Sequence, residues 1–80
     1  MASKIDKEIT AAFGAHVKKL LRAKGFSMRS LANEADIEYS QIARIVSGII
    51  SPSITTAYKI AEALDISMKD LFDFKYPRSK

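Results

Sequence analysis

The 80-residue chain contains no cysteine, which excludes disulfide bonds and thiolate metal sites as supports for a small core. It also lacks any run of about 18 apolar residues, which excludes a transmembrane helix. The first ten residues, MASKIDKEIT, are polar and lack the apolar stretch of a secretion signal. We therefore expect one soluble, cytoplasmic domain over residues 1–80, with its core at about 9–72 and no membrane partner.

The sequence patterns of enzymes and metal sites are missing as well. There is no nucleophile elbow, glycine-rich phosphate loop or paired-carboxylate constellation, and His16 has neither a cysteine nor a second histidine to share a metal. We therefore expect no enzyme activity, no cofactor and no metal ion. His16 is predicted to lie at a helix surface or boundary.

Acidic residues are absent between Glu8 and Glu34. The basic residues of this stretch are Lys18, Lys19, Arg22, Lys24 and Arg29. With a net charge of +4 and a pI of about 9.5 for the chain, such a one-sign block suits an anionic partner such as nucleic acid. Charge alone also allows a simple solvated helix face.

No segment alternates convincingly with period two, so the sequence predicts an all-α fold of five helices. The helices are expected at about 6–24, 28–35, 39–47, 54–64 and from 68 onwards, with N-caps at Ser27, Ser53 and Ser67. Gly14 lies inside the first helix, where it weakens the helix and points to a close packing contact. Residues 73–80 are predicted to form an irregular tail.

Apolar residues at spacings of three and four define the inner faces of the two longest helices. For the first helix these residues are Ile9, Phe13, Val17, Leu20 and Leu21. For the fourth helix they are Ile54, Ala57, Tyr58, Ala61 and Leu64.

The stretch from Phe26 to Val46 has the spacing of a helix-turn-helix. Asp36, in the turn of this motif, tolerates a left-handed backbone. The inner positions of the motif are Leu31, Ala32, Ala35, Ile37, Ile42 and Ile45. The outer face of its second helix carries side chains that can form hydrogen bonds, Tyr39, Ser40, Gln41 and Arg44. A helix with a dry inner face and such an outer face, on a basic protein, is suited to reading a DNA major groove.

With these segments in place, the sequence resembles the Cro/phage-repressor type of helix-turn-helix regulators, the XRE-like family. The resemblance covers Phe13 to Phe72, and its matching segments are KG at Lys24, FSMRSLA from Phe26, IEYSQIARIVSG from Ile37, SPS from Ser51, IAEAL from Ile60 and ISMKDLF from Ile66. It implies a five-helix lambda-repressor-like DNA-binding domain. It further implies a sequence-specific transcriptional repressor or autoregulator that binds an inverted repeat as a homodimer.

The chain departs from the family at several positions. Met28 stands where a phosphate-contacting glutamine is usual, and Asp36 stands where glycine is usual. Leu21 and Val46 occupy the positions of a buried arginine–glutamate pair. The joint loss of both charges is consistent, because an apolar pair can replace a buried ion pair at little cost.

The resemblance also implies roles for individual side chains. Base contacts are expected from Tyr39, Ser40, Gln41 and Arg44, and phosphate contacts from Arg29, Ser47, Gly48 and Ser51. Glu38 is an unusual N-cap that favours the helix N-terminus electrostatically. The expected dimer interface consists of Ile49, Ile50, Leu71, Phe72 and Phe74.

A protein-interaction module of the same fold, such as a toxin-binding antitoxin, is the alternative. Met28 and the acids around Glu38 favour it, whereas Arg44 and the basic block oppose it. Within the regulator class, a restriction–modification controller, a phage-type repressor and an antitoxin all have this size. The expected partners are double-stranded DNA and a second copy of the chain, with a protein partner in the antitoxin case.

Overall fold

A computed structural model describes residues 3–77, which form five helices and no strand within that range. The helices are α1 (Lys4–Ala23), α2 (Met28–Ala35), α3 (Tyr39–Val46), α4 (Ile54–Leu64) and α5 (Met68–Leu71). The predicted all-α, five-helix fold is confirmed. The first helix begins two residues earlier than expected because Ser3 and Asp6 form a capping box, with reciprocal hydrogen bonds of 3.1 and 3.2 Å.

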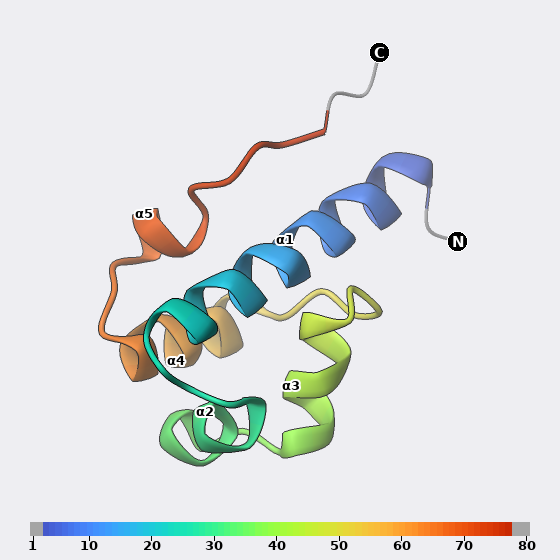
Figure 1. Cartoon of the computed structure of the whole chain (residues 1–80). Coiled ribbons are helices and arrows are strands. Elements are labelled where there is room, and N and C mark those ends of the chain that lie inside the picture. Colours follow the sequence, from blue (N-terminus) through green and yellow to red (C-terminus); the bar gives the residue numbers. More distant parts are fainter. Residues whose placement is uncertain (1–2, 78–80) are drawn as a thin grey trace.

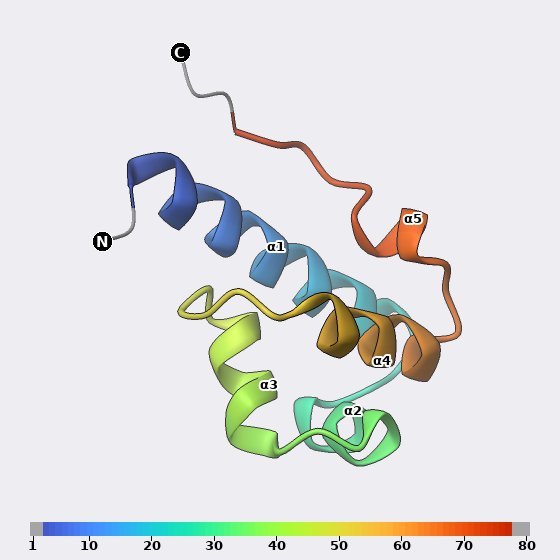
Figure 2. The same ribbon diagram turned by 180° about the vertical axis from the view of Figure 1, so that it is seen from behind.

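The long helix α1 crosses the other helices, and α2 and α3 lie below it in Figure 1. Helix α4 lies behind α1 in that view and in front of it in Figure 2. Helix α3 packs against α1 and α2, while α4 packs against α2 and α5. After α5 the chain runs back beside α1 in both views.

Serine side chains cap the starts of α2, α4 and α5, as predicted. Ser27 forms a capping box with Ser30, Ser53 accepts a hydrogen bond from the Thr56 N–H at 3.1 Å, and Ser67 accepts one from the Asp70 N–H at 3.0 Å. Each bond satisfies a backbone donor that the first helical turn leaves unpaired.

Two helices end on an aspartate with a left-handed backbone. Asp36 has a φ of 59° after α2, as the sequence predicted, and Asp65 has a φ of 58° after α4, which the sequence did not predict. In each case the next backbone N–H bonds back into the helix, from Ile37 to Ala32 and from Ile66 to Ala61. Both turns therefore close by the same backbone geometry.

The buried apolar side chains form one cluster to which all five helices contribute. Its members are Phe13, Val17, Leu21, Leu31, Ala32, Ile42, Ile45, Ala57, Ile60, Ala61, Leu64 and Leu71. The expected inner face of α4 is partly wrong, because Ile54 is 80% exposed and Tyr58 is 51% exposed. Ile60 is fully buried instead, so the buried stripe of α4 is shifted around the helix. Ile9 of α1, also expected inside, is 39% exposed.

Gly14 marks a close approach between α1 and the end of α3. A Cβ atom at this position would lie 2.3 Å from the Ile45 carbonyl oxygen and 2.9 Å from that of Val46. The close packing contact predicted from the sequence is therefore confirmed. Gly48, with a φ of 76°, makes a second approach, since its Cβ would lie 2.8 Å from the Ala11 Cα.

Aromatic side chains after α5 pack on α1. Phe72 stacks on Phe13 with ring centroids 5.2 Å apart, and Phe74 lies 5.3 Å from the His16 ring. His16 is half-buried and its Nε2 lies 3.0 Å from the Asp70 carbonyl oxygen, so it links α1 to α5 at the helix boundary where it was expected. Residues 73–77 are irregular as predicted, and residues 78–80 of the predicted tail lie outside the described range. No helix within residues 3–77 is both long and apolar enough to cross a membrane.

Candidate nucleic-acid interface

The α2–turn–α3 unit has the inner face that the sequence predicted. Leu31, Ile42 and Ile45 have no exposed surface, and Ala32 is 3% exposed where the two helices pack together. Ile37 in the turn is half-buried and packs against the core. The left-handed Asp36 reverses the chain between the helices, so that the apolar side of α3 meets the core.

The opposite side of α3 faces outward. Tyr39, Ser40 and Arg44 are exposed, and Gln41 is half-buried. The predicted base-contacting side chains therefore lie on the outer part of one helix whose inner residues are fully buried. Glu38 occupies the N-cap without a side-chain hydrogen bond to the helix, which agrees with a purely electrostatic role there.

Arg29 and Tyr39 are in direct contact. The Arg29 guanidinium carbon lies 4.4 Å from the centroid of the Tyr39 ring, a cation–π geometry. The sequence assigned these residues separately, one to a phosphate and one to a base. Nothing in their spacing predicted that they would touch.

The first residues of the loop after α3 have already used their backbone donors. The N–H groups of Ser47, Gly48 and Ile49 donate to the carbonyls of Ala43, Ile45 and Arg44 at 2.9–3.0 Å. The N–H of Gly48 is thus not free for the phosphate contact expected of it. The hydroxyls of the exposed Ser47 and Ser51 are further donors in this loop.

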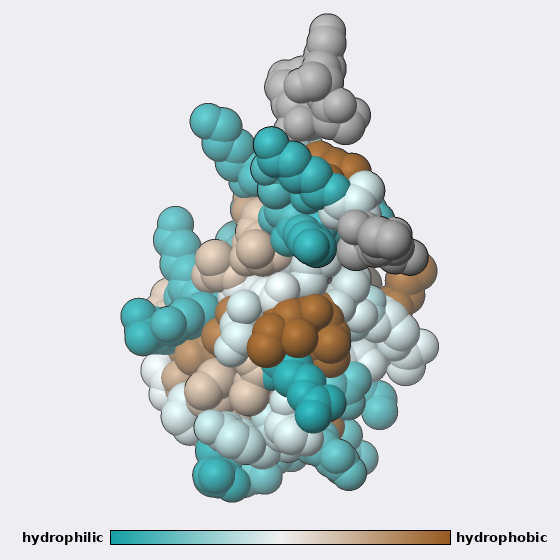
Figure 3. Space-filling view, turned by 90° about the vertical axis from the view of Figure 1, so that its right-hand side faces the viewer, coloured by the Kyte–Doolittle hydropathy of each residue, from teal (hydrophilic) through white to brown (hydrophobic). Residues whose placement is uncertain are grey.

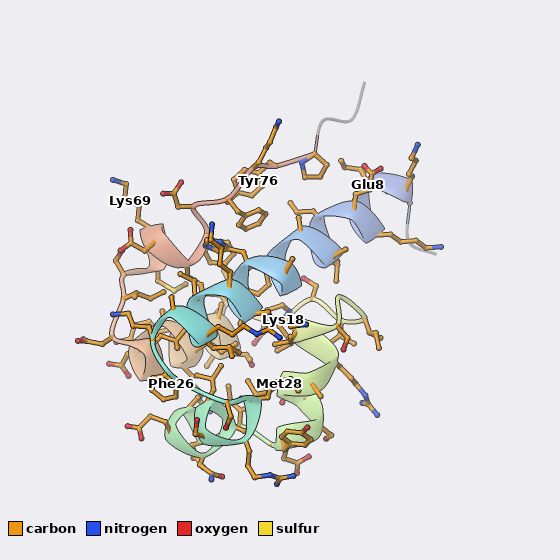
Figure 4. The ribbon with its side chains drawn as sticks, viewed as in Figure 1. Glu8, Lys18, Phe26, Met28, Lys69 and Tyr76 are labelled. Carbon is orange, nitrogen blue, oxygen red and sulfur yellow. The ribbon has the colours of Figure 1, made fainter. Side chains whose placement is uncertain are left out.

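The family departures at Leu21, Met28 and Val46 line one small hollow beside Phe26 and the stems of Lys18 and Arg22. Figure 4 shows Met28 at the start of α2, below Lys18 on α1. Leu21 is 3% exposed, whereas Met28 and Val46 are half-buried and pack against the core. Met28 therefore takes part in the same apolar packing as Leu21 and Val46.

The five expected dimer residues do not share one surface. Leu71 is fully buried in the core, so its side chain has no area to offer a partner, and the expectation for it is wrong. Phe72 is 37% exposed and Phe74 is half-buried, because both pack on α1. Ile50 is half-buried and packs against the core, whereas Ile49 is 69% exposed.

Exposed isoleucines flank the loop between α3 and α4. Ile49 lies near its start, and Ile54, which the sequence predicts to be buried, lies at its end. Figure 3 shows brown, hydrophobic atoms at the centre of the face that carries this loop, with hydrophilic side chains around them. Ile54 also lines a groove of about 240 Å³ with Ile9, Phe72 and Tyr76.

Positive charge remains at the surface of α1 and α2. All basic residues of the block are exposed, namely Lys18, Lys19, Arg22, Lys24 and Arg29. Away from this region, the Glu62 carboxylate accepts a 3.0 Å hydrogen bond from Tyr58 and thereby raises the pKa of that hydroxyl above 10.0. Within residues 3–77 no three histidine or acidic side chains converge on a possible metal position.

Comparison with known proteins agrees with this geometry. The sequence profile of the HTH_3 family, described as helix-turn-helix, matches residues 17–71, more than half of the chain. The restriction-modification controller protein C.AhdI from Aeromonas hydrophila is 32% identical, over 79% of this chain and 96% of its own, with a TM-score of 0.77. An HTH_3 family transcriptional regulator from Vibrio cholerae is 27% identical, over 84% of this chain and 38% of its own, with a TM-score of 0.79. No curated protein matches the chain.

The two packed helices with an outward hydrogen-bonding face define a helix-turn-helix protein of the XRE type. The chain belongs to the HTH_3 helix-turn-helix family. It is a DNA-binding transcriptional regulator and not an enzyme.

Proposed function

We propose that the protein binds an inverted-repeat operator as a homodimer and acts there as a repressor or autoregulator. The outer face of α3 carries this proposal, because Tyr39, Ser40 and Arg44 are exposed on a helix whose Ile42 and Ile45 are fully buried. Arg44 is the principal base-reading residue, since an arginine can bond O6 and N7 of one guanine together. Tyr39, Ser40 and Gln41 supply the further base contacts.

Phosphate contacts would flank this face on both sides. Arg29 at the start of α2 supplies a cation, and Ser47 and Ser51 supply hydroxyl donors after α3. The basic block on α1 and α2 adds sequence-independent attraction, which weakens as salt rises. Together these groups would fix the register of α3 in the groove while the base contacts select the sequence.

The proposed dimer surface begins at Ile49 and Ile54, on either side of the loop that follows α3. A symmetric interface there would place the two recognition helices on the same side of the dimer. Inverted half-sites would then lie about 34 Å apart, one helical turn of DNA. Residues 1–80 would act as a single domain in this assembly.

The restriction–modification controller role is favoured among the three regulator roles. The similarity to C.AhdI, a protein of that kind, extends over 96% of its chain. The alternative of a protein-binding module loses its main support, because Met28 packs against the core. Its presence in place of glutamine follows from packing and does not require a loss of DNA binding.

Selection from a pool of randomised DNA duplexes at two salt concentrations tests the proposal. We expect an enriched inverted repeat whose affinity falls steeply as salt rises. Binding without an enriched sequence would indicate that the outward residues of α3 contact the DNA backbone and do not read bases. Absence of binding would favour the protein-partner alternative.

Arg44→Ala is the decisive variant. It removes one bidentate base contact, so affinity for the selected duplex should fall by about 5- to 150-fold, with relaxed preference at one base pair. Lys69→Ala is the matched control, because Lys69 is an exposed cation on α5, far from α3 in Figure 4. Fluorescence anisotropy measures both, and equal losses for the two variants would contradict the base contact.

A further inference from the structure

The contact between Arg29 and Tyr39 joins the first turn of α2 to the first turn of α3. The guanidinium carbon lies 4.4 Å from the ring centroid, well inside the range of about 6 Å for a cation–π contact. Arg29 is exposed, and Tyr39 retains 39% of its surface. The pair therefore lies open to solvent at the point where the two helices of the DNA-binding unit begin.

A cation–π contact does not use the arginine's hydrogen-bond donors as a carboxylate would. The guanidinium carries five N–H groups in one plane, and the Tyr39 ring contacts it through its π-face, with the guanidinium carbon 4.4 Å from the ring centroid. Two of these donors can bind the oxygens of one phosphate in parallel. The ring also restricts the side chain, so that less rotamer freedom is lost when a phosphate binds.

Acidic residues close to Arg29 in the sequence give the restraint by the Tyr39 ring a purpose. The exposed carboxylates of Glu34, Asp36 and Glu38 lie in the same part of the chain and compete in principle for a cation. The structure places the guanidinium over the Tyr39 ring instead. An arginine held by a neutral ring keeps its full charge for the DNA backbone.

We propose that Arg29 and Tyr39 act as one unit that grips a single DNA phosphate, with Arg29 as the donor and Tyr39 as its positioning residue. This inference rests on the proposed function and extends it. It gives the Tyr39 ring a role apart from base contact, and it leaves only one face of that ring for a base. It also couples the phosphate contact made from α2, which does not depend on DNA sequence, to the first residue of α3.

A double-mutant cycle tests the coupling. Arg29→Ala should weaken binding to the selected operator duplex and to a mixed-sequence duplex alike. It should also reduce the slope of log affinity against log salt by about 0.9, the value for one phosphate. In a Tyr39→Leu background the same change should cost about two- to tenfold less, which is the range for ordering one more flexible side chain on binding.

Further variants separate the ring from its hydroxyl and provide a matched control. Tyr39→Phe keeps the ring, so the coupling should persist although the hydroxyl is lost. Arg22→Ala removes an equal charge at an exposed position on α1. Its effect should be the same with and without Tyr39→Leu, because no ring positions that side chain on the DNA.

The possible outcomes are distinct. Additive losses in the Arg29–Tyr39 cycle would overturn the inference and leave DNA binding intact. A loss confined to the operator duplex would overturn the phosphate assignment. A wild-type chain that binds neither duplex would overturn the proposed function and this inference with it.

Nuclear magnetic resonance of the free protein gives a readout that does not depend on DNA. The ring current of Tyr39 should shift the side-chain protons of Arg29, and Tyr39→Leu should abolish that shift. Tyr58→Leu, at an exposed tyrosine on α4, should leave it unchanged. Arg29 resonances that do not respond to Tyr39→Leu would contradict the stacked geometry and the inference.

Discussion

At the residue scale, single positions decide where backbones can meet. Gly14 leaves room for the carbonyls of Ile45 and Val46, and Gly48 leaves room for Ala11. The sequence predicted the approach at Gly14, because a glycine inside a helix needs a reason. It did not identify the backbone that approaches, since that depends on how α3 lies across α1.

Gly14→Ala should destabilise the protein although alanine is the better helix former. The new Cβ would lie 2.3 Å from the Ile45 oxygen, and overpacking of this kind costs about 1–3 kcal/mol. Thermal melting followed by circular dichroism would measure the change. Gly25→Ala is the control, because its Cβ meets nothing within 4 Å and the variant bears only the left-handed strain at a φ of 79°. Helix propensity alone predicts a gain of about 1 kcal/mol for Gly14→Ala, and that result would contradict the close approach.

At the element scale, caps and turns were more predictable than helix orientation. The start of α2 and both bounds of α4 follow from local chemistry, chiefly from serine N-caps. The inner face of α4 was wrong at Ile54 and Tyr58, and Ile60 was missed. Helix α4 is apolar around much of its circumference, so periodicity alone does not choose which side meets the core.

The packing of α1 against α3 and α2 provides an element-scale prediction. Leu21 is buried and shares a hollow with Val46 and Met28, so Leu21→Arg should cost about 3–5 kcal/mol through an uncompensated buried charge. Addition of Val46→Glu should recover part of the loss by restoring the family's ion pair. Chemical denaturation of the wild type, Leu21→Arg and the double variant measures this. A double variant less stable than Leu21→Arg would show that the two positions do not face each other.

At the scale of the whole molecule, the sequence predicted the fold and the outward side of α3, but not which other apolar side chains stay exposed on the surface. The sequence predicted Leu71 and Phe74 at the dimer interface, yet Leu71 lies in the core and Phe74 packs on α1. The contact between Arg29 and Tyr39 could not be predicted from the sequence either, because it depends on the turn between α2 and α3. Such contacts follow from tertiary geometry, which local periodicity does not contain.

Ile49→Asp tests the proposed dimer. Ile49 is 69% exposed, so its replacement should leave the fold intact and raise the dimer dissociation constant at least tenfold, since two apolar side chains leave a symmetric interface. Sedimentation equilibrium without DNA measures the constant, with Asn33→Asp on α2 as a control of equal charge. Ile50→Asp is less informative, because Ile50 packs against the core. An unchanged constant for Ile49→Asp would remove this residue from the interface.

The close packing of α3 on α1 at Gly14 has a consequence for how such proteins diverge in evolution. Main-chain atoms and inward side chains hold the helix, so its outward residues at 39, 40, 41 and 44 carry little of the folding free energy. After duplication of the gene, a few substitutions at these positions would give the copy a new operator while its scaffold stays as stable as before. Two regulators in one cell could then evolve different operators, and each intermediate variant along the way would still fold.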